Sequence, residues 1–338
     1  MRRFEWHTGE RFSFESGGEL ASLDLVYHTS DRPYRPGDKV VWVCHALTGN
    51  SNPEDWWPKM VGPGCMFDPD ECFVVCVSML CSPYGACGPA SVNPATGKPF
   101  FFDFPRTTVR DIVRANILVR KHLGIEKIDL MLGPSIGGFQ TLEWVIMEPD
   151  VIEKAVFLAT ATRVPPYLTA FNESQRLALL ADPTFREAKS LQGGSAGLKC
   201  ARSIALISYR TFDGYNLTQA EQEDDTLFAD RAASYQRYQG EKLLRRDFDA
   251  YSYWYLSYAL DSMNVGRGRG GVKKALERIR AQCSVISITS DYLFPPRHGQ
   301  ETVAALRHAA YYEIQSIFGH DGFLIEHEQL AAILRPLL

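Results

Sequence analysis

The stretch Leu130-Met-Leu-Gly-Pro-Ser-Ile-Gly-Gly-Phe139 decides the fold. The apolar run Ile128–Leu132 predicts a buried strand, and the mostly apolar segment after the stretch predicts a buried helix. Between them, Gly133–Gly137 fits the pattern G-x-S-x-G, and a strand, a sharp turn and a helix are the context of a nucleophile elbow. A side chain in place of either flanking glycine is expected to collide where the strand and the helix cross. The stretch therefore predicts that Ser135 stands at the edge of a parallel sheet.

The composition is that of an ordinary globular protein. Of 338 residues, 45% are hydrophobic and 22% are charged, which allows one large domain or one domain with an insertion. The net charge of -4 gives no reason to expect binding to nucleic acid, and no apolar run is long enough to predict a membrane span. The segment Met1–His7 lacks the apolar stretch of a signal peptide, so we expect a cytoplasmic protein.

The eight cysteines do not indicate a metal site. None belongs to a C-x-x-C pair and no histidine cluster accompanies them, so no metal is expected. Cys44, Cys76 and Cys283 lie in apolar runs, where cysteine behaves as a small hydrophobic residue. A reduced protein is the simpler interpretation, and a disulfide between Cys81 and Cys87 is the alternative.

Strand-like and helical patterns alternate along the first half of the chain. Residues 12–28 predict two antiparallel strands that open the sheet, and residues 80–105 predict a long ordered loop. Further buried strands are predicted at 39–44, 72–78 and 155–159, and a helix capped by Thr107 or Thr108 is predicted to end at Gly124. This alternation predicts an α/β fold with a mostly parallel central sheet and helices on both faces.

A long helical segment interrupts this alternation. No convincing strand is found from about residue 162 to 271, and helical patterns cover 175–180, 197–209, 220–242 and 247–263. Strands at 283–288 and 310–315 and helices at 297–308 and 323–337 follow. We therefore expect a catalytic domain made of residues 1–162 and 272–338, with residues 163–271 inserted as a helical cap. The many tyrosines and arginines of this segment indicate the core of the cap or, alternatively, a dimer contact.

A serine nucleophile needs a base and an acid, and in hydrolase-type sheets these follow in the order Ser, Asp, His. Asp291 follows the predicted strand 283–288, and His320 follows the next strand, so Ser135, Asp291 and His320 are the candidate triad. His45, also at a strand end, is the competing base. The candidate oxyanion donors are the backbone N–H groups of Ile136, after the nucleophile, and Leu47, in the loop after an earlier strand.

Two charged segments are interpreted without a catalytic role. The segment Gly266-Arg-Gly-Arg-Gly-Gly271 does not follow a strand, so it is no dinucleotide-binding signature. A flexible solvent loop is the first interpretation of it, and contact with the phosphates of a CoA donor is the alternative. The acidic cluster Glu221–Asp225 is interpreted as the solvated start of a helix.

Several segments together resemble the homoserine O-acetyltransferase family of the α/β-hydrolase superfamily. They span nearly the whole chain in one order: His45–Gly49, Tyr84–Gly85, Gly88–Pro89, Asn93–Pro94, Asp103–Pro105, Thr108–Asp111, the Ser135 stretch, Ala170–Arg176, Ser290–Pro295 and Gly319–Gly322. The resemblance implies ping-pong transfer of acetyl from the co-substrate acetyl-CoA to an amino-acid hydroxyl in methionine biosynthesis, with Ser135 acylated and no bound cofactor. It also implies that Arg202 pairs with the carboxylate of the amino-acid substrate, that Tyr209 forms a hydrogen bond near it, and that Asp321 holds the ammonium group of the substrate. Dimerisation through the cap is implied as well.

The sequence also departs from the family pattern at some positions. Pro134 stands where the family usually has glycine, and members with Gly-Pro-Ser resemble serine-acylating enzymes, so homoserine and serine both stay open as acceptors. Met263 replaces a histidine that related sequences often carry, and the motifs do not distinguish an acetyl from a succinyl donor. An esterase or thioesterase with the same triad, and a non-catalytic scaffold, are the alternatives from other classes.

Overall fold

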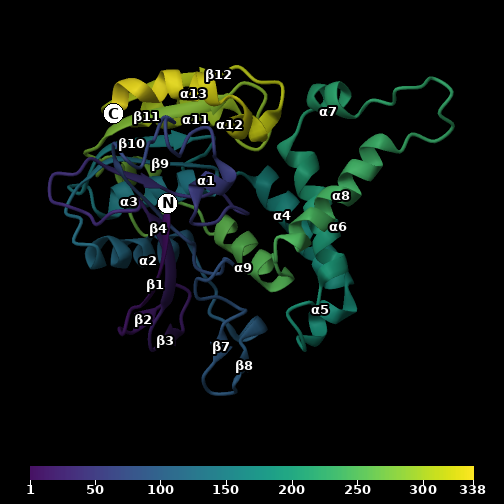
Figure 1. Ribbon diagram of the computed structural model, residues 1–338, viewed down its shortest axis with the longest axis horizontal. Coiled ribbons are helices and arrows are strands. Elements are labelled where there is room, and N and C mark those ends of the chain that lie inside the picture. The colour runs from purple at the N-terminus through teal and green to yellow at the C-terminus, as the bar shows by residue number, and fades with distance from the viewer.

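A mostly parallel sheet forms the centre of the protein in the computed structural model, which describes residues 1–338 (Figure 1). The sheet has eight strands in the order β1-β4-β6-β5-β9-β10-β11-β12. The strands are β1 (Arg2–His7), β4 (Asp24–Thr29), β5 (Val40–Val43), β6 (Phe73–Val77), β9 (Ile128–Pro134), β10 (Ile152–Leu158), β11 (Gln282–Ile288) and β12 (Ala309–Ile314). Strands β5, β6 and β9–β12 pair in parallel, and β4 pairs antiparallel with β1 and β6. The predicted fold class is confirmed.

Apolar residues cover both faces of this sheet. Because successive side chains of a strand point to opposite faces, Trp42 and Phe157 belong to one hydrophobic cluster and Val43 and Leu158 to the other. Helices α2 (Val109–His122) and α3 (Ile136–Met147) pack on the first face, and α13 (His327–Leu334) packs on the second. This double cover explains why the central strands read as continuous apolar runs.

The beginning of the chain differs from the prediction. Residues 12–28 do not supply two strands to the sheet, because β2 (Phe12–Ser13) and β3 (Glu19–Leu20) pair with each other as a separate ribbon. The outermost strand is β1, which was not predicted. Its half-buried Phe4 and Trp6 alternate with exposed residues and pack against the core, a short apolar alternation that the sequence analysis did not use, and β1 pairs with β4 along its whole length.

The long loop of residues 80–105 is ordered, as predicted. It contains a short hairpin of β7 (Val92–Asn93) and β8 (Lys98–Pro99) and a 3-10 turn at Phe101–Asp103. The buried Tyr255 hydroxyl bonds the carbonyl oxygens of Phe102 and Phe104, at 2.8 and 2.7 Å. The loop is therefore fastened to the helical segment that follows β10.

The chain between β10 and β11 forms helices only, and we call this part the helical insertion (Figure 1). Its helices are α4 (Pro166–Ala181), α5 (Pro183–Glu187), α6 (Ser195–Tyr209), α7 (Phe212–Gln219), α8 (Arg231–Arg245), α9 (Ala250–Asp261) and α10 (Val272–Leu276). The tyrosines of α9 at positions 251, 253 and 255 are buried, so the core interpretation holds for them. The predicted helix 220–242 is wrong over residues 220–230, because α8 begins only at Arg231 and the exposed acidic cluster Glu221–Asp225 lies in a loop, with no apolar face to bury.

The end of the chain also differs from the prediction of one helix over 323–337. It consists of α12 (Gly322–Ile325), α13 and a 3-10 turn at Arg335–Leu337. The carbonyl oxygen of Phe323 accepts a hydrogen bond of 2.9 Å from the indole Nε1–H of Trp57. This bond takes the place of one to a backbone N–H of the next helical turn, so the helix is interrupted here. The break turns α13 onto the sheet.

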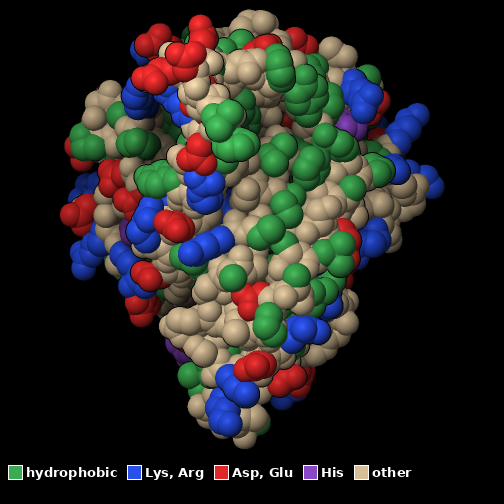
Figure 2. Space-filling model, turned by 90° about the vertical axis from the view of Figure 1, so that its right-hand side faces the viewer, with side chains coloured by type: hydrophobic (Ala, Val, Ile, Leu, Met, Phe, Trp, Pro, Cys, Tyr) green, Lys and Arg blue, Asp and Glu red, His purple; other side chains and the backbone are tan.

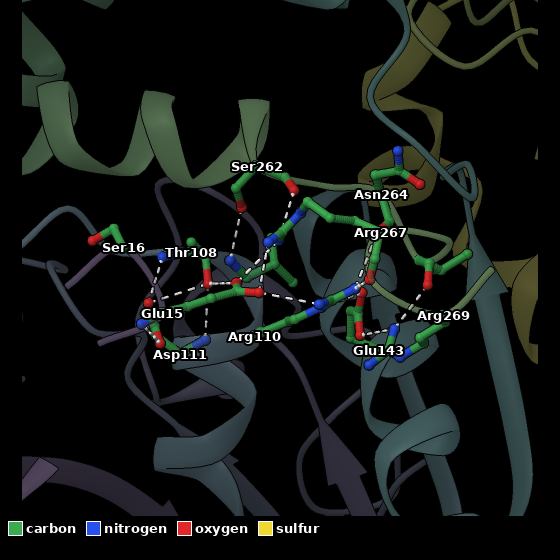
Figure 3. A network of polar contacts seen from close by, with 12 residues as sticks. Glu15, Ser16, Thr108, Arg110, Asp111, Glu143, Ser262, Asn264, Arg267 and Arg269 are labelled. Atoms are coloured by element: carbon green, nitrogen blue, oxygen red, sulfur yellow. Dashed lines mark hydrogen bonds and ion pairs between the residues drawn. The ribbon is translucent and has the colours of Figure 1, made fainter. Parts of the chain in front are cut away.

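The glycine-rich loop 266–271 is held by ion pairs (Figure 3). Arg269 contacts the buried carboxylate of Glu143 at 2.7 Å, and Arg267 contacts Glu15 at 3.0 Å. Arg110 joins both carboxylates, at 3.0 Å from Glu15 and 3.2 Å from Glu143. The loop is largely exposed, as the interpretation as a solvent loop expects, but it is not flexible at its two arginines, which carboxylates hold. Both arginines of the loop are already paired with carboxylates, which does not favour the alternative of a contact with the phosphates of a CoA donor.

All eight cysteines are free, so the alternative of a disulfide between Cys81 and Cys87 is wrong. Burial raises the pKa of Cys87 to about 11, which keeps its thiol protonated. None of the helices is both long enough and apolar enough to span a bilayer. No group of three or more His, Cys, Asp or Glu side chains is arranged to hold a metal ion.

Candidate active site

Ser135 stands at the sharp turn between β9 and α3. Its backbone angles of φ 59° and ψ -120° are rare for a residue with a side chain, and its N–H donates to Leu158 O at 3.0 Å. A Cβ on Gly133 would lie 2.6 Å from Cys44 O, and one on Gly137 would lie closer still to the same oxygen. The predicted collision at the flanking glycines is confirmed, and the turn has the geometry of a nucleophile elbow.

Asp291 and His320 form a buried pair. Asp291 Oδ2 lies 2.7 Å from His320 Nδ1, and its Oδ1 accepts the N–H groups of Leu293 and Phe294 at 2.8 and 3.0 Å. Burial lowers the pKa of His320, but the charge and the hydrogen bond of Asp291 outweigh it, so the pKa lies above the ordinary histidine value. With Nδ1 engaged by the carboxylate, Nε2 is the nitrogen left to exchange a proton.

His45, the competing base, has no free ring nitrogen. Its Nδ1 lies 2.9 Å from Ala46 O, and its Nε2 accepts the N–H of Met79 at 3.0 Å. The side chain is fully buried, and burial lowers its pKa to about 4. His45 is therefore a neutral residue that fixes the loop containing Leu47, a role that the sequence did not predict.

A cavity of about 290 Å³ joins Ser135 and His320 to the helical insertion. Leu47 lies on its wall and has no hydrogen-bond acceptor in the protein for its N–H. Ile136 is the first residue of α3, where an N–H group has no acceptor within the helix. Both predicted oxyanion donors therefore have N–H groups available near the nucleophile.

The three predicted substrate-binding residues line the same cavity. The guanidinium carbon of Arg202 lies 5.5 Å from the ring centroid of Tyr209, whose ring lies 5.9 Å from that of His320. Asp321 Oδ2 accepts a hydrogen bond of 2.9 Å from Arg210 Nε. Asp321 is thus already paired with one cation, and its other oxygen stays available, since a carboxylate accepts several hydrogen bonds.

Several polar residues of the cavity were missed by the sequence analysis. They are Asp55 from α1 (Pro53–Trp56), Arg210 after α6, and four residues of α8 or its C-cap, Tyr235, Gln239, Lys242 and Arg246. The spacing of these last four, every third or fourth residue, places them on one helix face. That spacing was the available signal, but only the packing of α6 against α8 shows which face turns to Ser135.

The arrangement is suited to acyl transfer. A serine on a strained turn, a base held by a buried carboxylate, and two free backbone donors are the components of covalent catalysis through an acyl-enzyme. The Arg202 guanidinium and the Asp321 carboxylate, in the same cavity, match the two charges of an amino acid. Side chains of α6 and α8 line the cavity together with Ser135 and His320.

Comparisons with known proteins agree with this geometry. Residues 39–326 match the model of the alpha/beta hydrolase fold family. The chain is 41% identical to the homoserine O-acetyltransferase of Cyclobacterium marinum, over 96% of this chain and 92% of the relative. A homoserine O-acetyltransferase from Bacillus anthracis superposes with a TM-score of 0.88 at 23% identity, covering 99% of this chain and 96% of that one. Esterase E22 superposes with a TM-score of 0.87 at 23% identity, covering 99% and 98%, and at this identity both structures show the fold alone.

Proposed function

Because the chain belongs to the homoserine O-acetyltransferase family, which has the α/β-hydrolase fold, we propose that it transfers an acetyl group from acetyl-CoA to the hydroxyl of L-homoserine. The observation that carries the proposal is the Asp291–His320 pair, whose histidine lines the same cavity as Ser135 and residues of the helical insertion. Incubation with acetyl-CoA and L-homoserine tests it. O-acetylhomoserine is the expected product, and free acetate as the only product would contradict the proposal.

In the first half-reaction the Ser135 hydroxyl attacks the carbonyl carbon of the thioester while His320 Nε2 takes its proton. The negative oxygen of the tetrahedral intermediate accepts the N–H groups of Leu47 and Ile136. The C–S bond then breaks, and His320 returns the proton to the departing thiolate, so that CoA leaves as a thiol. The acetyl group remains as an ester on Ser135.

In the second half-reaction the acceptor hydroxyl gives its proton to the same His320 and attacks the ester carbonyl. The bond to Ser135 Oγ breaks, and His320 returns the proton to that oxygen. Water competes with the acceptor at this stage, so residues 163–271 are proposed as a cap that limits access to the ester. The lining of the cavity supports this, since residues of α6 and α8 form part of its wall beside Ser135 and His320.

Arg202 is proposed to bind the carboxylate of the acceptor. Replacing it with methionine removes a charged hydrogen-bond donor, so we expect the KM for homoserine to rise about 10- to 100-fold. The measurement compares homoserine with aminopropanol, its analogue without the carboxylate. The substitution should leave the low activity with aminopropanol nearly unchanged. An equal loss with both acceptors would assign Arg202 to the packing of Tyr209 instead.

Serine is the second candidate acceptor, because Pro134 stands where the family usually has glycine. Pro134 is buried directly before Ser135 and has no N–H to donate, so the turn differs chemically from one with glycine at this position. The ratio of kcat/KM for homoserine and serine, measured side by side, decides between them. We expect homoserine to be preferred, and a ratio in favour of serine would overturn that assignment while leaving the ping-pong mechanism intact.

We also propose a homodimer formed through the helical insertion. Large hydrophobic side chains are exposed there, and Figure 2 shows such side chains on the face of the protein that carries the insertion. They include Ile207, Phe212, Leu217, Leu227 and Phe228, the last two more than 80% exposed. Apolar surface of this kind favours a protein partner. Light scattering is expected to give the mass of a dimer, and a monomer at micromolar concentration would contradict it.

A further inference from the structure

Two basic side chains at the end of α8 face the cavity without an anionic partner. Lys242 lies in the last turn of the helix and Arg246 is its C-cap residue, four positions later. Both line the cavity that contains Ser135. Neither of them forms an ion pair with a carboxylate, although both have long side chains that are at least partly exposed to solvent.

The neighbouring basic residues of the same helix behave differently. Arg245, between the two, contacts Glu241 at 3.7 Å, and Arg237 contacts Asp230 at 2.7 Å. Both of these arginines point away from the cavity, since neither lines it. At the C-terminal end of α8, the cations without an ion pair are thus the two that line the candidate active site.

The cavity as a whole carries an excess of positive charge. Its lining includes Arg202, Arg210, Lys242 and Arg246 against two carboxylates, in a protein whose net charge is -4. Both carboxylates are already engaged: Asp321 is paired with Arg210, and Asp55 accepts hydrogen bonds from two asparagine side chains. A single acceptor carboxylate does not balance this charge. The remaining cations indicate a second, more highly charged anion.

We propose that Lys242 and Arg246 bind the phosphate groups of the acyl-CoA donor. This inference rests on the proposed function and assigns the donor subsite of the same cavity. A volume of about 290 Å³ admits the acyl group and part of the thiol arm, but the nucleotide of CoA is too large to follow. The phosphates then lie at the mouth, where exposed cations are available to them.

If Lys242 and Arg246 only stabilise the end of α8, a different result is expected. Cations near a helix C-terminus stabilise the helix through its dipole, whatever they bind. In that case Arg245, in the same turn, should matter as much as Lys242. Arg245→Met is therefore the matched control, because it removes a cation from the same helix end without touching the cavity.

The experiment measures the KM for two acetyl donors in the double variant Lys242→Met/Arg246→Met. Acetyl-CoA carries the phosphates, and S-acetylpantetheine has the same thioester without them. We expect the KM for acetyl-CoA to rise about 10- to 100-fold and the KM for S-acetylpantetheine to change less than about twofold. Arg245→Met should change neither, and the charge-retaining variant Lys242→Arg/Arg246→Lys should restore most of the affinity for acetyl-CoA.

Binding of CoA itself, measured by calorimetry, separates this inference from the proposed function. The double variant should bind CoA at least about tenfold more weakly than the unmodified protein. Added salt should weaken the binding of CoA more in the unmodified protein than in the double variant. Equal affinity in both proteins would overturn the phosphate subsite even if O-acetylhomoserine is formed. Conversely, tight and charge-dependent CoA binding without formation of O-acetylhomoserine would overturn the proposed acceptor reaction and leave the subsite standing.

Discussion

Replacing Ser135 with alanine is expected to lower the rate of O-acetylhomoserine formation about 10,000- to 1,000,000-fold. The hydroxyl is the proposed nucleophile, and without it no acyl-enzyme forms. Mass spectrometry after incubation with acetyl-CoA should find the acetyl group on the unmodified protein and none on the variant. Substrate binding should survive, because the cavity walls are unchanged.

Folding of the Ser135→Ala variant has to be checked, since Ser135 has a positive φ. Alanine tolerates this angle about as well as serine does, so the thermal midpoint is expected to stay within a few degrees of that of the unmodified protein. The interpretation of Ser135 as the nucleophile would be refuted by an active variant, or by an acetyl group that stays on the protein after the substitution.

Replacing Asp291 with asparagine is expected to lower kcat about 10,000-fold, the second largest effect. The amide keeps the shape of the side chain but offers an N–H to His320 Nδ1, which favours the wrong tautomer of the ring. It also removes the charge that raises the pKa of His320. KM for homoserine should change little, because Arg202 and Tyr209 do not contact Asp291.

The pH dependence gives a separate test of the pair. A protonated His320 cannot accept the serine proton, so activity is present above its pKa and lost as the pH falls through it. Since that pKa is raised, the loss should begin at a higher pH than for an ordinary histidine. In Asp291→Asn the residual activity should decline at lower pH. An acidic limb at the same pH in both proteins would exclude His320 as the group that titrates.

The central features of the fold follow from local patterns. The strand before Ser135, the glycines beside it and the helix after it are contiguous in the chain, and each is recognisable from spacing and residue type. Asp291 and His320 were found in the same way, because chain order and strand ends limit the choice. His45 satisfied part of that pattern, and only its hydrogen bonds to Ala46 and Met79 show that it has no free nitrogen.

The features that the sequence analysis missed depend on long-range pairing. The edge strand β1 has only a short apolar alternation, Phe4 and Trp6, and its place in the sheet is set by backbone pairing with β4. Arg267 and Arg269 were interpreted as flexible because their partners, Glu15 and Glu143, lie far away in the chain. For a similar reason, the sequence alone did not show which face of α8 turns to the cavity. Its polar residues repeat with the period of a helix, but the direction they face is set by packing on α6.

The most direct test of the account follows a single acetyl group through the protein. The purified protein is mixed with acetyl-CoA alone, the acetylated residue is located by peptide mass spectrometry, and L-homoserine is then added. We predict that Ser135 becomes acetylated as CoA is released, and that homoserine removes the group as O-acetylhomoserine much faster than water removes it as acetate. An unmodified Ser135, or release as acetate at the same rate with and without homoserine, would contradict the account.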